Sequence, residues 1–397
     1  MADHITCYEL PGILPGASSE MVRRAYQDKG KQLGHRHKEG TEMAGTIDEA
    51  RLGEFMGQMA GYMTGGALCF GVWLGDELGL YRALAGAGPQ TADALADATS
   101  CNPRLVREWL DGQVAGGLVG YGQATDTYEL SAEAAVALAD DSSPVFVARG
   151  MNAFASLFID HDKIADAFRG SGGIPWGEHH PRLFSGTEWF FRTGYRAYLP
   201  AEWLPALDGV DAKLHSGAKV ADVGCGHGAS AVVMAQAYPA VRVWGFDYHA
   251  PSIETARERA TEAGVADRTT FEVAEAKNYP GRYDLICFFD CLHDMGDPVG
   301  IARYAREHLE ADGTVLLVEP FALDDKAANR TTNPMAALFY TVSSAICTPN
   351  SLAQDVALGL GAQAGEARLR EVFEAAGYSR FRRAAETPMN LILEARP

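Results

Sequence analysis

Residues 220–229 read Val-Ala-Asp-Val-Gly-Cys-Gly-His-Gly-Ala and join a short apolar run to the start of a helical one. Glycine has no Cβ, so a glycine-rich turn lets a ligand approach the backbone closely. The glycines also satisfy the G-x-G-x-x-G/A pattern of dinucleotide sites, so they do not identify the ligand by themselves. The stretch predicts a ligand-binding turn between a strand and a helix.

Strand-like and helix-like segments alternate around this turn. The expected strands are residues 219–223, 241–247, 270–273, 283–288 and 313–318, and the expected helices are residues 229–238, 252–263 and 299–309. Such alternation predicts a parallel sheet that helices cover on both faces. Residues 381–385 and 391–395 flank Pro-Met-Asn and predict an antiparallel hairpin. The predicted fold class is therefore α/β, a Rossmann-like sheet that ends in a hairpin.

Two acidic residues distinguish between the possible ligands. Asp222 lies two residues before the first glycine, where a carboxylate would repel a pyrophosphate but attract the ammonium and sulfonium groups of S-adenosylmethionine. Asp247 ends the next expected strand about 20 residues downstream, where a carboxylate accepts both ribose hydroxyls. We expect S-adenosylmethionine as cofactor and S-adenosylhomocysteine as its product.

A candidate catalytic segment follows the strand at residues 283–288. Residues 292–295 read Leu-His-Asp-Met. Here the chain resembles small-molecule O-methyltransferases of the class I S-adenosylmethionine-dependent type, whose Leu-His-Asp-Trp motif carries a histidine that deprotonates the acceptor hydroxyl. The resemblance implies that His293 is a general base, and a neutral imidazole with a pKa near ~6.5 suits a phenol or acidic hydroxyl. Asp294 or another carboxylate is expected to orient the ring.

The resemblance covers roughly residues 47–397 and implies a seven-stranded sheet and further site residues. Glu275 and Ala276 stand where that family usually has Asp and an apolar residue near the adenine. The expected cofactor-binding residues are Asp222, Gly224, Cys225, Gly226, Gly228, Asp247, Tyr248, Glu275, Ala276, Phe289 and Asp290.

The acceptor pocket is expected from two apolar regions. Aromatic residues are dense between residues 145 and 207, and residues 333–347 carry an apolar stripe. The expected pocket residues are Trp176, Tyr195, Tyr198, Met335, Phe339 and Tyr340. The Glu-His-His run at residues 178–180 has no third ligand at a suitable spacing, which favours a surface loop, and no metal is expected.

Residues 91–130 have the pattern of a winged helix: helix, turn, helix and wing. The second helix balances Arg104 and Arg107 with Glu108 and Asp111, so it is a poor clamp for a phosphate backbone. The helices between residues 47 and 84 are more apolar than a free surface allows, which predicts a homodimer.

Composition sets further bounds. The formal net charge of −18 opposes binding to nucleic acid. The 7 cysteines are scattered without a C-x-x-C pair, which is typical of a reduced, cytoplasmic protein. No apolar run reaches the ~18 residues of a membrane span, and the first residues do not read as a signal peptide. We expect a cytoplasmic protein whose partner is a small molecule and which uses neither nucleic acid nor membrane.

Four segments are expected along the chain. Residues 1–45 are an extension with a weak J-domain resemblance, which lacks the His-Pro-Asp signature where residues 34–37 read Gly-His-Arg-His. Residues 46–145 are expected to form the helical winged-helix domain, residues 146–212 a linker and active-site roof, and residues 213–397 the cofactor-binding domain.

The expected function is methyl transfer to a small aromatic or apolar molecule, with oxygen favoured over nitrogen or carbon as the acceptor atom. Two other readings stay open. One is a regulator that senses S-adenosylmethionine through a degenerate domain, against which the intact Asp222, glycine and Asp247 set argues. The other is an enzyme that uses this fold for non-methylating chemistry.

Overall fold

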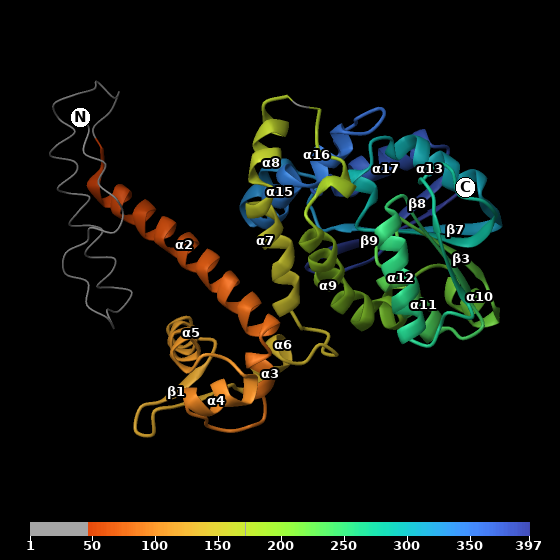
Figure 1. Cartoon of the computed structure of the whole chain (residues 1–397). Coiled ribbons are helices and arrows are strands. Elements are labelled where there is room, and N and C mark those ends of the chain that lie inside the picture. The colour runs from red at the N-terminus through yellow and green to blue at the C-terminus, as the bar shows by residue number, and fades with distance from the viewer. Residues whose placement is uncertain (1–46, 171) are drawn as a thin grey trace.

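The computed structural model describes residues 47–170 and 172–397 (Figure 1). A helical N-terminal part precedes a C-terminal part that is built on a seven-stranded sheet. The J-domain-like extension falls within residues 1–46 and lies outside the described residues.

The N-terminal part contains the expected winged helix. It comprises α2 (Glu49–Glu77), α3 (Leu80–Leu84), α4 (Ala92–Thr99), α5 (Pro103–Ala115), β1 (Gly120–Gly122), β2 (Thr127–Glu129) and α6 (Ala132–Leu138). The side chains of Thr91 and Asn102 accept backbone N–H groups at the starts of α4 and α5, which fixes where the two helices begin. β1 and β2 pair antiparallel as the wing.

The long helix α2 packs on the winged helix near its C-terminal end, where most of its buried residues lie. There the Trp109 indole donates a hydrogen bond to the carbonyl of Gly71 at 2.8 Å, and a Cβ at Gly75 would lie 2.4 Å from the ring of Tyr81. The rest of α2 extends away from the C-terminal part (Figure 1).

The sheet has the strand order β5-β4-β3-β6-β7-β9-β8. Its strands are β3 (Lys219–Val223), β4 (Arg242–Asp247), β5 (Thr269–Val273), β6 (Tyr283–Phe289), β7 (Leu309–Pro320), β8 (Arg380–Glu386) and β9 (Asn390–Arg396). Strands β3 to β7 are parallel, and β8 and β9 pair antiparallel at the β7 edge. The predicted α/β fold class and its closing hairpin are confirmed.

Helices cover both faces of the sheet. The helices α10 (Val210–Ser216), α11 (Ala229–Ala237) and α12 (Ala250–Glu262) contribute to one buried cluster, which includes Val220. The helices α13 (Pro298–Glu307) and α17 (Gly365–Ala375) contribute to the other, which includes Ala221 and Val223. Successive residues of a strand point to opposite faces, so β3 supplies apolar side chains to both cores.

The remaining helices are α7 (Met151–Ile159), α8 (His161–Phe168), α9 (Pro181–Tyr198), α14 (Lys326–Thr332), α15 (Ala336–Ala345) and α16 (Cys347–Leu352), with the short helical segments η2 (Ala148–Gly150), η3 (Trp176–Glu178), η4 (Leu199–Trp203) and η5 (Leu292–Asp294). Residues of η3, α9, η5 and α16 line a cavity at the carboxyl ends of the parallel strands. In open α/β sheets, ligands bind at this edge. Among the described residues, no helix has the length and apolar character needed to cross a membrane.

Candidate active site

The glycine-rich turn after β3 needs its glycines. Gly224, Gly226 and Gly228 have φ angles of 76°, 51° and 76°, a region that side chains with a Cβ rarely adopt. A Cβ at Gly224 would lie 2.9 Å from the Cys291 sulfur, and one at Gly228 would lie 2.8 Å from the Phe271 ring. Turn geometry therefore disfavours larger residues at all three positions, and close packing adds to this at Gly224 and Gly228.

Asp247 ties the end of β4 to this turn. Its Oδ2 accepts a hydrogen bond from the Gly226 N–H at 2.9 Å, and its Oδ1 accepts one from the His249 N–H at 2.9 Å. Burial raises the pKa of the carboxyl, which the two N–H donors partly offset. The carboxylate is thereby held in one orientation beside the glycine-rich turn.

Asp222 lies beneath the turn and is fully buried. Its Oδ2 accepts a hydrogen bond from the Ser230 hydroxyl at 2.5 Å, whereas Oδ1 has no partner among the described residues. Burial raises the pKa of this carboxyl to about 7. Asp222 sits behind the glycines rather than in the wall of a cavity.

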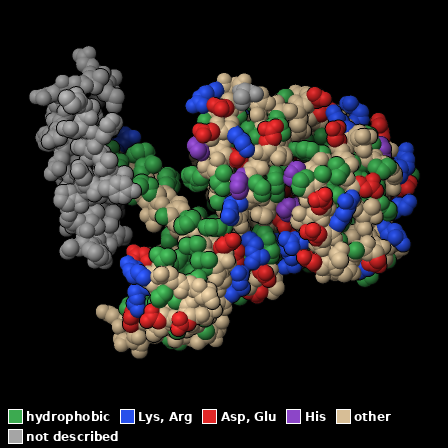
Figure 2. Space-filling model, in the orientation of Figure 1, with side chains coloured by type: hydrophobic (Ala, Val, Ile, Leu, Met, Phe, Trp, Pro, Cys, Tyr) green, Lys and Arg blue, Asp and Glu red, His purple; other side chains and the backbone are tan. Residues whose placement is uncertain are grey.

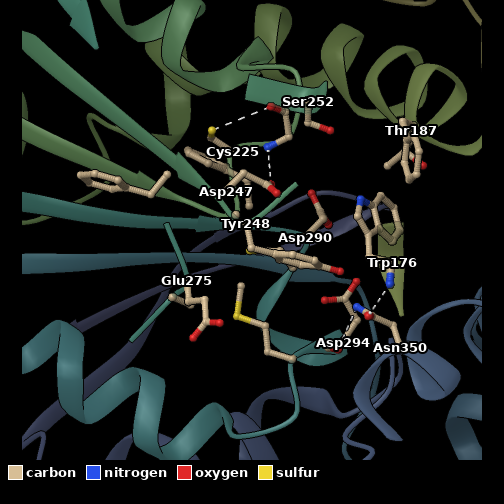
Figure 3. Close-up of a pocket in the computed structure, with 18 of the residues that line it drawn as sticks. Trp176, Thr187, Cys225, Asp247, Tyr248, Ser252, Glu275, Asp290, Asp294 and Asn350 are labelled. Carbon is tan, nitrogen blue, oxygen red and sulfur yellow. Dashed lines mark hydrogen bonds between the residues drawn. The ribbon is translucent and has the colours of Figure 1, made fainter. Parts of the chain in front are cut away.

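A large cavity of about 500 Å³ opens at the ends of β3, β4 and β6 (Figure 3). Several residues expected to bind cofactor or act in catalysis line it: Gly224, Cys225, Gly226, Asp247, Tyr248, Glu275, Ala276, Phe289, Asp290 and Asp294. Asp222 and Gly228 do not line it; they shape the turn from behind. In the view of Figure 3, Tyr248 lies between Glu275 on one side and Trp176 on the other.

A small cavity of about 90 Å³ lies under α7, α9 and α15. Its walls are largely aromatic and aliphatic, with contributions from Phe154, Leu157, Leu183, Phe190, Leu338, Phe339, Val342 and Ile346. The large and small cavities have five lining residues in common, namely Trp176, Thr187, Phe191, Asp290 and Asp294. These residues border both spaces and are called the shared wall below.

His293 lines the small cavity and is held from behind by Glu319 of β7. The imidazole Nδ1 lies 2.5 Å from the Glu319 Oε2, and the His293 backbone N–H donates to Oε1 at 3.3 Å. Burial lowers the pKa of His293, but the Glu319 carboxylate, together with Cys347, outweighs burial and raises that pKa well above its usual value. The ring is therefore a stronger base than the unperturbed imidazole that the sequence suggests.

Asp294 does not orient His293. It lies in the shared wall, and burial raises the pKa of its carboxyl to about 7. Its backbone carbonyl accepts a hydrogen bond from the Asn350 side chain at 3.2 Å. The carboxylate that fixes the imidazole is Glu319.

Asp290 is the second acidic group of the shared wall. Its φ of 51° is unusual for a residue with a side chain, and two partners from distant segments hold its carboxyl. Tyr195 donates its hydroxyl at 2.9 Å, and Asn390 donates its amide at 2.7 Å. Burial raises the pKa of Asp290 to about 8.

The comparisons with known proteins agree with this geometry. Residues 214–377 match the family model described as methyltransferase domain, and residues 66–140 match the model described as Rv2258c-like winged HTH domain. The chain carries a methyltransferase domain. The winged helix precedes that domain in the sequence, as the N-terminal pattern predicts.

Curated relatives match only part of this chain. The 27-O-demethylrifamycin SV methyltransferase of Amycolatopsis mediterranei is 35% identical over 107 residues, which are 26% of this chain and 39% of that protein. The ubiquinone biosynthesis O-methyltransferase of Pseudomonas aeruginosa is 30% identical over 131 residues, 32% of this chain and 51% of that protein. The alignments thus span about half or less of these relatives.

Solved structures match nearly the whole fold. The mitomycin 7-O-methyltransferase MmcR is 20% identical with a TM-score of 0.64, covering 88% of this chain and 100% of that one. Human N-acetylserotonin methyltransferase is 19% identical with a TM-score of 0.65, covering 89% and 99%. At these identities the likeness shows the shared fold.

The residues expected in the acceptor pocket of the methyltransferase domain divide into two groups. Trp176 lines both cavities, Tyr195 lines the large one, and Phe339 lines the small one. Tyr198, Met335 and Tyr340 line neither. Tyr198 stacks on Trp203 with ring centroids 6.1 Å apart. Tyr340 accepts a hydrogen bond from the Asn329 side chain at 3.3 Å. These contacts hold the two side chains away from both cavities.

Sequence reasoning missed Glu188 and His227, which lie in contact with each other in the lining of the large cavity. The Glu188 carboxylate of α9 lies 2.9 Å from the His227 Nδ1 and also pairs with Arg192 and Arg259. Burial opposes the charge on Glu188, but these partners outweigh it and leave its pKa below the usual value. His227 stands inside the glycine-rich turn, yet nothing in the sequence around Glu188 points to this contact.

The Glu-His-His run also differs from the surface loop that the sequence favours. His179 is buried, with Nδ1 3.4 Å from the Asp160 carboxylate, and the His180 ring accepts the backbone N–H of Arg182 at the start of α9. Both histidines therefore make structural contacts at the N-terminal end of α9. The described residues contain no group of three potential metal ligands.

Proposed function

We propose that this protein transfers the methyl group of S-adenosylmethionine to a hydroxyl of a small aromatic or apolar acceptor. One observation carries the proposal: the large and small cavities share the wall formed by Trp176, Thr187, Phe191, Asp290 and Asp294, and His293 stands on the small side of it. A donor in one cavity and an acceptor in the other would meet at this wall.

The large cavity fits the donor chemically. Asp247 supplies a fixed carboxylate for ribose hydroxyls, and Glu275 lies at the far side for the adenine. A Cβ at Gly226 would meet nothing within 4 Å, so the turn leaves its backbone open to a close ligand at this position. Human N-acetylserotonin methyltransferase, a structural neighbour, has been solved in complex with S-adenosylmethionine.

His293 is the proposed general base, with Glu319 as its orienting partner. The bound donor supplies an electrophilic methyl group, so no Lewis acid is required. As the acceptor oxygen forms its bond to the methyl carbon, His293 takes the hydroxyl proton and the carbon–sulfur bond breaks to give S-adenosylhomocysteine. The Glu319 carboxylate stabilises the imidazolium that results.

The test is a transfer assay with S-adenosylmethionine labelled on its methyl group and a panel of hydroxyarenes. We expect labelled product and S-adenosylhomocysteine in equal amounts, with a mass gain of one methyl group on the acceptor. Consumption of the donor with an unmethylated product would instead support non-methylating chemistry on this fold.

The protein is proposed to act as a homodimer through α2. Its exposed apolar residues include Phe55, Met63 and Phe70, with 56%, 61% and 60% of their surface exposed. They recur at helical spacing along one helix, and Figure 2 shows hydrophobic side chains gathered there. Light scattering should give a dimer mass at micromolar concentration, and the double substitution F55E and M63E should give the monomer mass. A monomeric wild type contradicts the proposal.

The winged helix is proposed to serve this assembly rather than bind DNA. In α5, Arg104 pairs with Glu108, and Arg107 pairs with Asp126 at 3.0 Å, so both arginines are neutralised within the protein. Salt-dependent binding to random duplex DNA would contradict this assignment. A cytoplasmic location stays a prediction from the cysteine pattern.

A further inference from the structure

We propose, on the basis of the S-adenosylmethionine site proposed above, that His227 binds the α-carboxylate at the amino-acid end of the cofactor. Glu188 of α9 is the positioning residue that holds the imidazole ring of His227. The site therefore selects cofactors that retain this carboxylate over those that have lost it.

The imidazole of His227 has one ring nitrogen engaged and one free for a ligand. Nδ1 lies 2.9 Å from the Glu188 carboxylate. In the part of the chain that the structure describes, no side chain or backbone group bonds to Nε2. His227 lines the large cavity, and 13% of its side chain remains exposed. Because Glu188 takes Nδ1, Nε2 is the nitrogen available to a ligand in the cavity.

Basic side chains are few in the lining of the large cavity. Among the described residues that line it, the lysine, arginine and histidine side chains are those of His227 and Lys277. Lys277 already pairs with Asp297 at 2.8 Å and follows Glu275, at the proposed adenine end. Carboxyl groups line the cavity from Glu188, Asp247, Glu275, Asp290, Asp294, Asp297 and Asp355. They can accept hydrogen bonds from the ammonium group of the donor, but the carboxylate of the donor requires a cation, which His227 supplies.

The position of His227 matches the amino-acid end of the donor. Asp247, the proposed ribose partner, accepts the N–H of Gly226, the residue before His227. In the view of Figure 3, Glu275 and Thr187 of α9 lie on opposite sides of Asp247. A donor with its adenine toward Glu275 and its ribose at Asp247 therefore extends its amino-acid end toward α9 and His227.

The charges behind the ring allow Glu188 to hold His227 without repelling a ligand carboxylate. Glu188 also pairs with Arg192 at 3.2 Å and with Arg259 at 3.3 Å, so two cations offset its charge. Arg259 in turn pairs with Glu262, whose side chain is 67% exposed and is therefore screened by water. When a ligand carboxylate lies at Nε2, anions flank both ring nitrogens of His227 and favour the protonated imidazole. Hydrogen bonds between such charged groups are stronger than those between neutral ones.

The experiment compares two ligands that differ by one group. Calorimetry measures binding to the full chain of S-adenosylhomocysteine and of S-adenosyl-3-thiopropylamine, which is the same molecule without its carboxylate. We expect S-adenosylhomocysteine to bind about 10 to 100-fold more tightly, as for the gain of one hydrogen bond to a charged group. Equal affinities, or tighter binding of the amine, would overturn the inference.

Variants at His227 test which residue supplies the cation. H227Q and H227N should each reduce the preference for S-adenosylhomocysteine to about threefold or less and leave the affinity for the amine within about twofold, which also shows that the site is folded. H215Q is the matched control at a histidine of α10 whose side chain is 66% exposed, and it should leave the preference unchanged. A preference that persists in both His227 variants, or an equal loss of both ligands in them, would overturn the assignment.

A variant at Glu188 tests the positioning role. E188Q removes the charge that holds the imidazole, so the preference for S-adenosylhomocysteine should fall by at least about threefold, with a smaller change in the affinity for the amine. An unchanged preference, or an equal loss of both ligands, would contradict the role of Glu188.

The same titrations separate this inference from the proposed function. If neither ligand binds to the wild type, the donor site fails and the inference fails with it. If both ligands bind to the wild type with equal affinity, the donor site stands and the inference alone fails.

Discussion

The large and small cavities share a wall, but the chain builds them in different ways. The large cavity is formed mainly by the turns that follow β3, β4 and β6, with Gly224, Asp247 and Asp290 at strand ends. The small cavity is formed by side chains from α7, α9 and α15, which lie far apart in the sequence. The first is a property of local motifs, and the second is a property of packing. The two should therefore respond differently to substitution.

The largest effect that distinguishes the two cavities is expected from H293A, which should lower turnover without a matching loss of cofactor affinity. Removal of a general base lowers turnover by about 10² to 10⁴-fold. Because His293 lines only the small cavity, the affinity for S-adenosylmethionine should change little. Steady-state kinetics and calorimetry check the two quantities separately, and a loss of cofactor affinity as large as the loss of turnover would show that the cavities are not independent.

The opposite result is expected from D247N, which should lower cofactor affinity more than turnover. The amide keeps the shape but loses an acceptor for the Gly226 or His249 N–H and the charge toward ribose hydroxyls. Cofactor affinity should fall about 10 to 100-fold, as for the loss of one or two hydrogen bonds to a charged group. Turnover at saturating cofactor should fall less. E275Q is the matched control, and we expect it to lower cofactor affinity less than D247N does. An equal loss of affinity in the two variants would contradict the proposed role of Asp247 in binding the ribose.

A smaller effect is expected on the pH dependence of activity. The base must be unprotonated, so kcat/KM should rise with pH through the pKa of His293, which Glu319 raises above its usual value. In E319Q the carboxylate is lost, and the inflection should move to lower pH. An unchanged inflection, or activity that falls with rising pH over the same interval, would contradict the paired arrangement of His293 and Glu319.

The smallest effects are expected from residues that the sequence places in the acceptor pocket and the structure places outside it. M335L and Y340F should alter KM and kcat by less than about twofold, because neither side chain lines a cavity and surface changes have small effects. F339L, from the same helix, should change the KM for the acceptor. A strong effect of Y340F would mean that α15 faces the cavity differently.

The features that could be predicted from the sequence belong to local motifs, and those that could not be predicted depend on contacts between distant segments. The strands and the glycine-rich turn could be predicted because they follow periodicity and short motifs, and Asp247 stands at a fixed distance from the turn. Glu319 could not be assigned to His293 because 26 residues separate them and only the adjacency of β6 and β7 brings them together. The same holds for the contact between Glu188 and His227, 39 residues apart.

Helix orientation explains the errors in the acceptor pocket. Met335, Phe339 and Tyr340 form one apolar stripe in the sequence, but α15 turns only part of that stripe toward the small cavity. Periodicity identifies which residues share a face and does not say what that face contacts. The contact depends on α7 and α9, whose packing the local sequence does not encode.

The glycine-rich turn and Asp247 are proposed to form a site for S-adenosylmethionine. Calorimetric titration of the wild-type protein with S-adenosylmethionine, S-adenosylhomocysteine and NAD tests it most directly. We expect the first two to bind with micromolar affinity and NAD not to bind, because a pyrophosphate at the glycine-rich turn would lie next to the buried Asp222 carboxyl. Preferential binding of NAD, or no binding of S-adenosylmethionine, would contradict it.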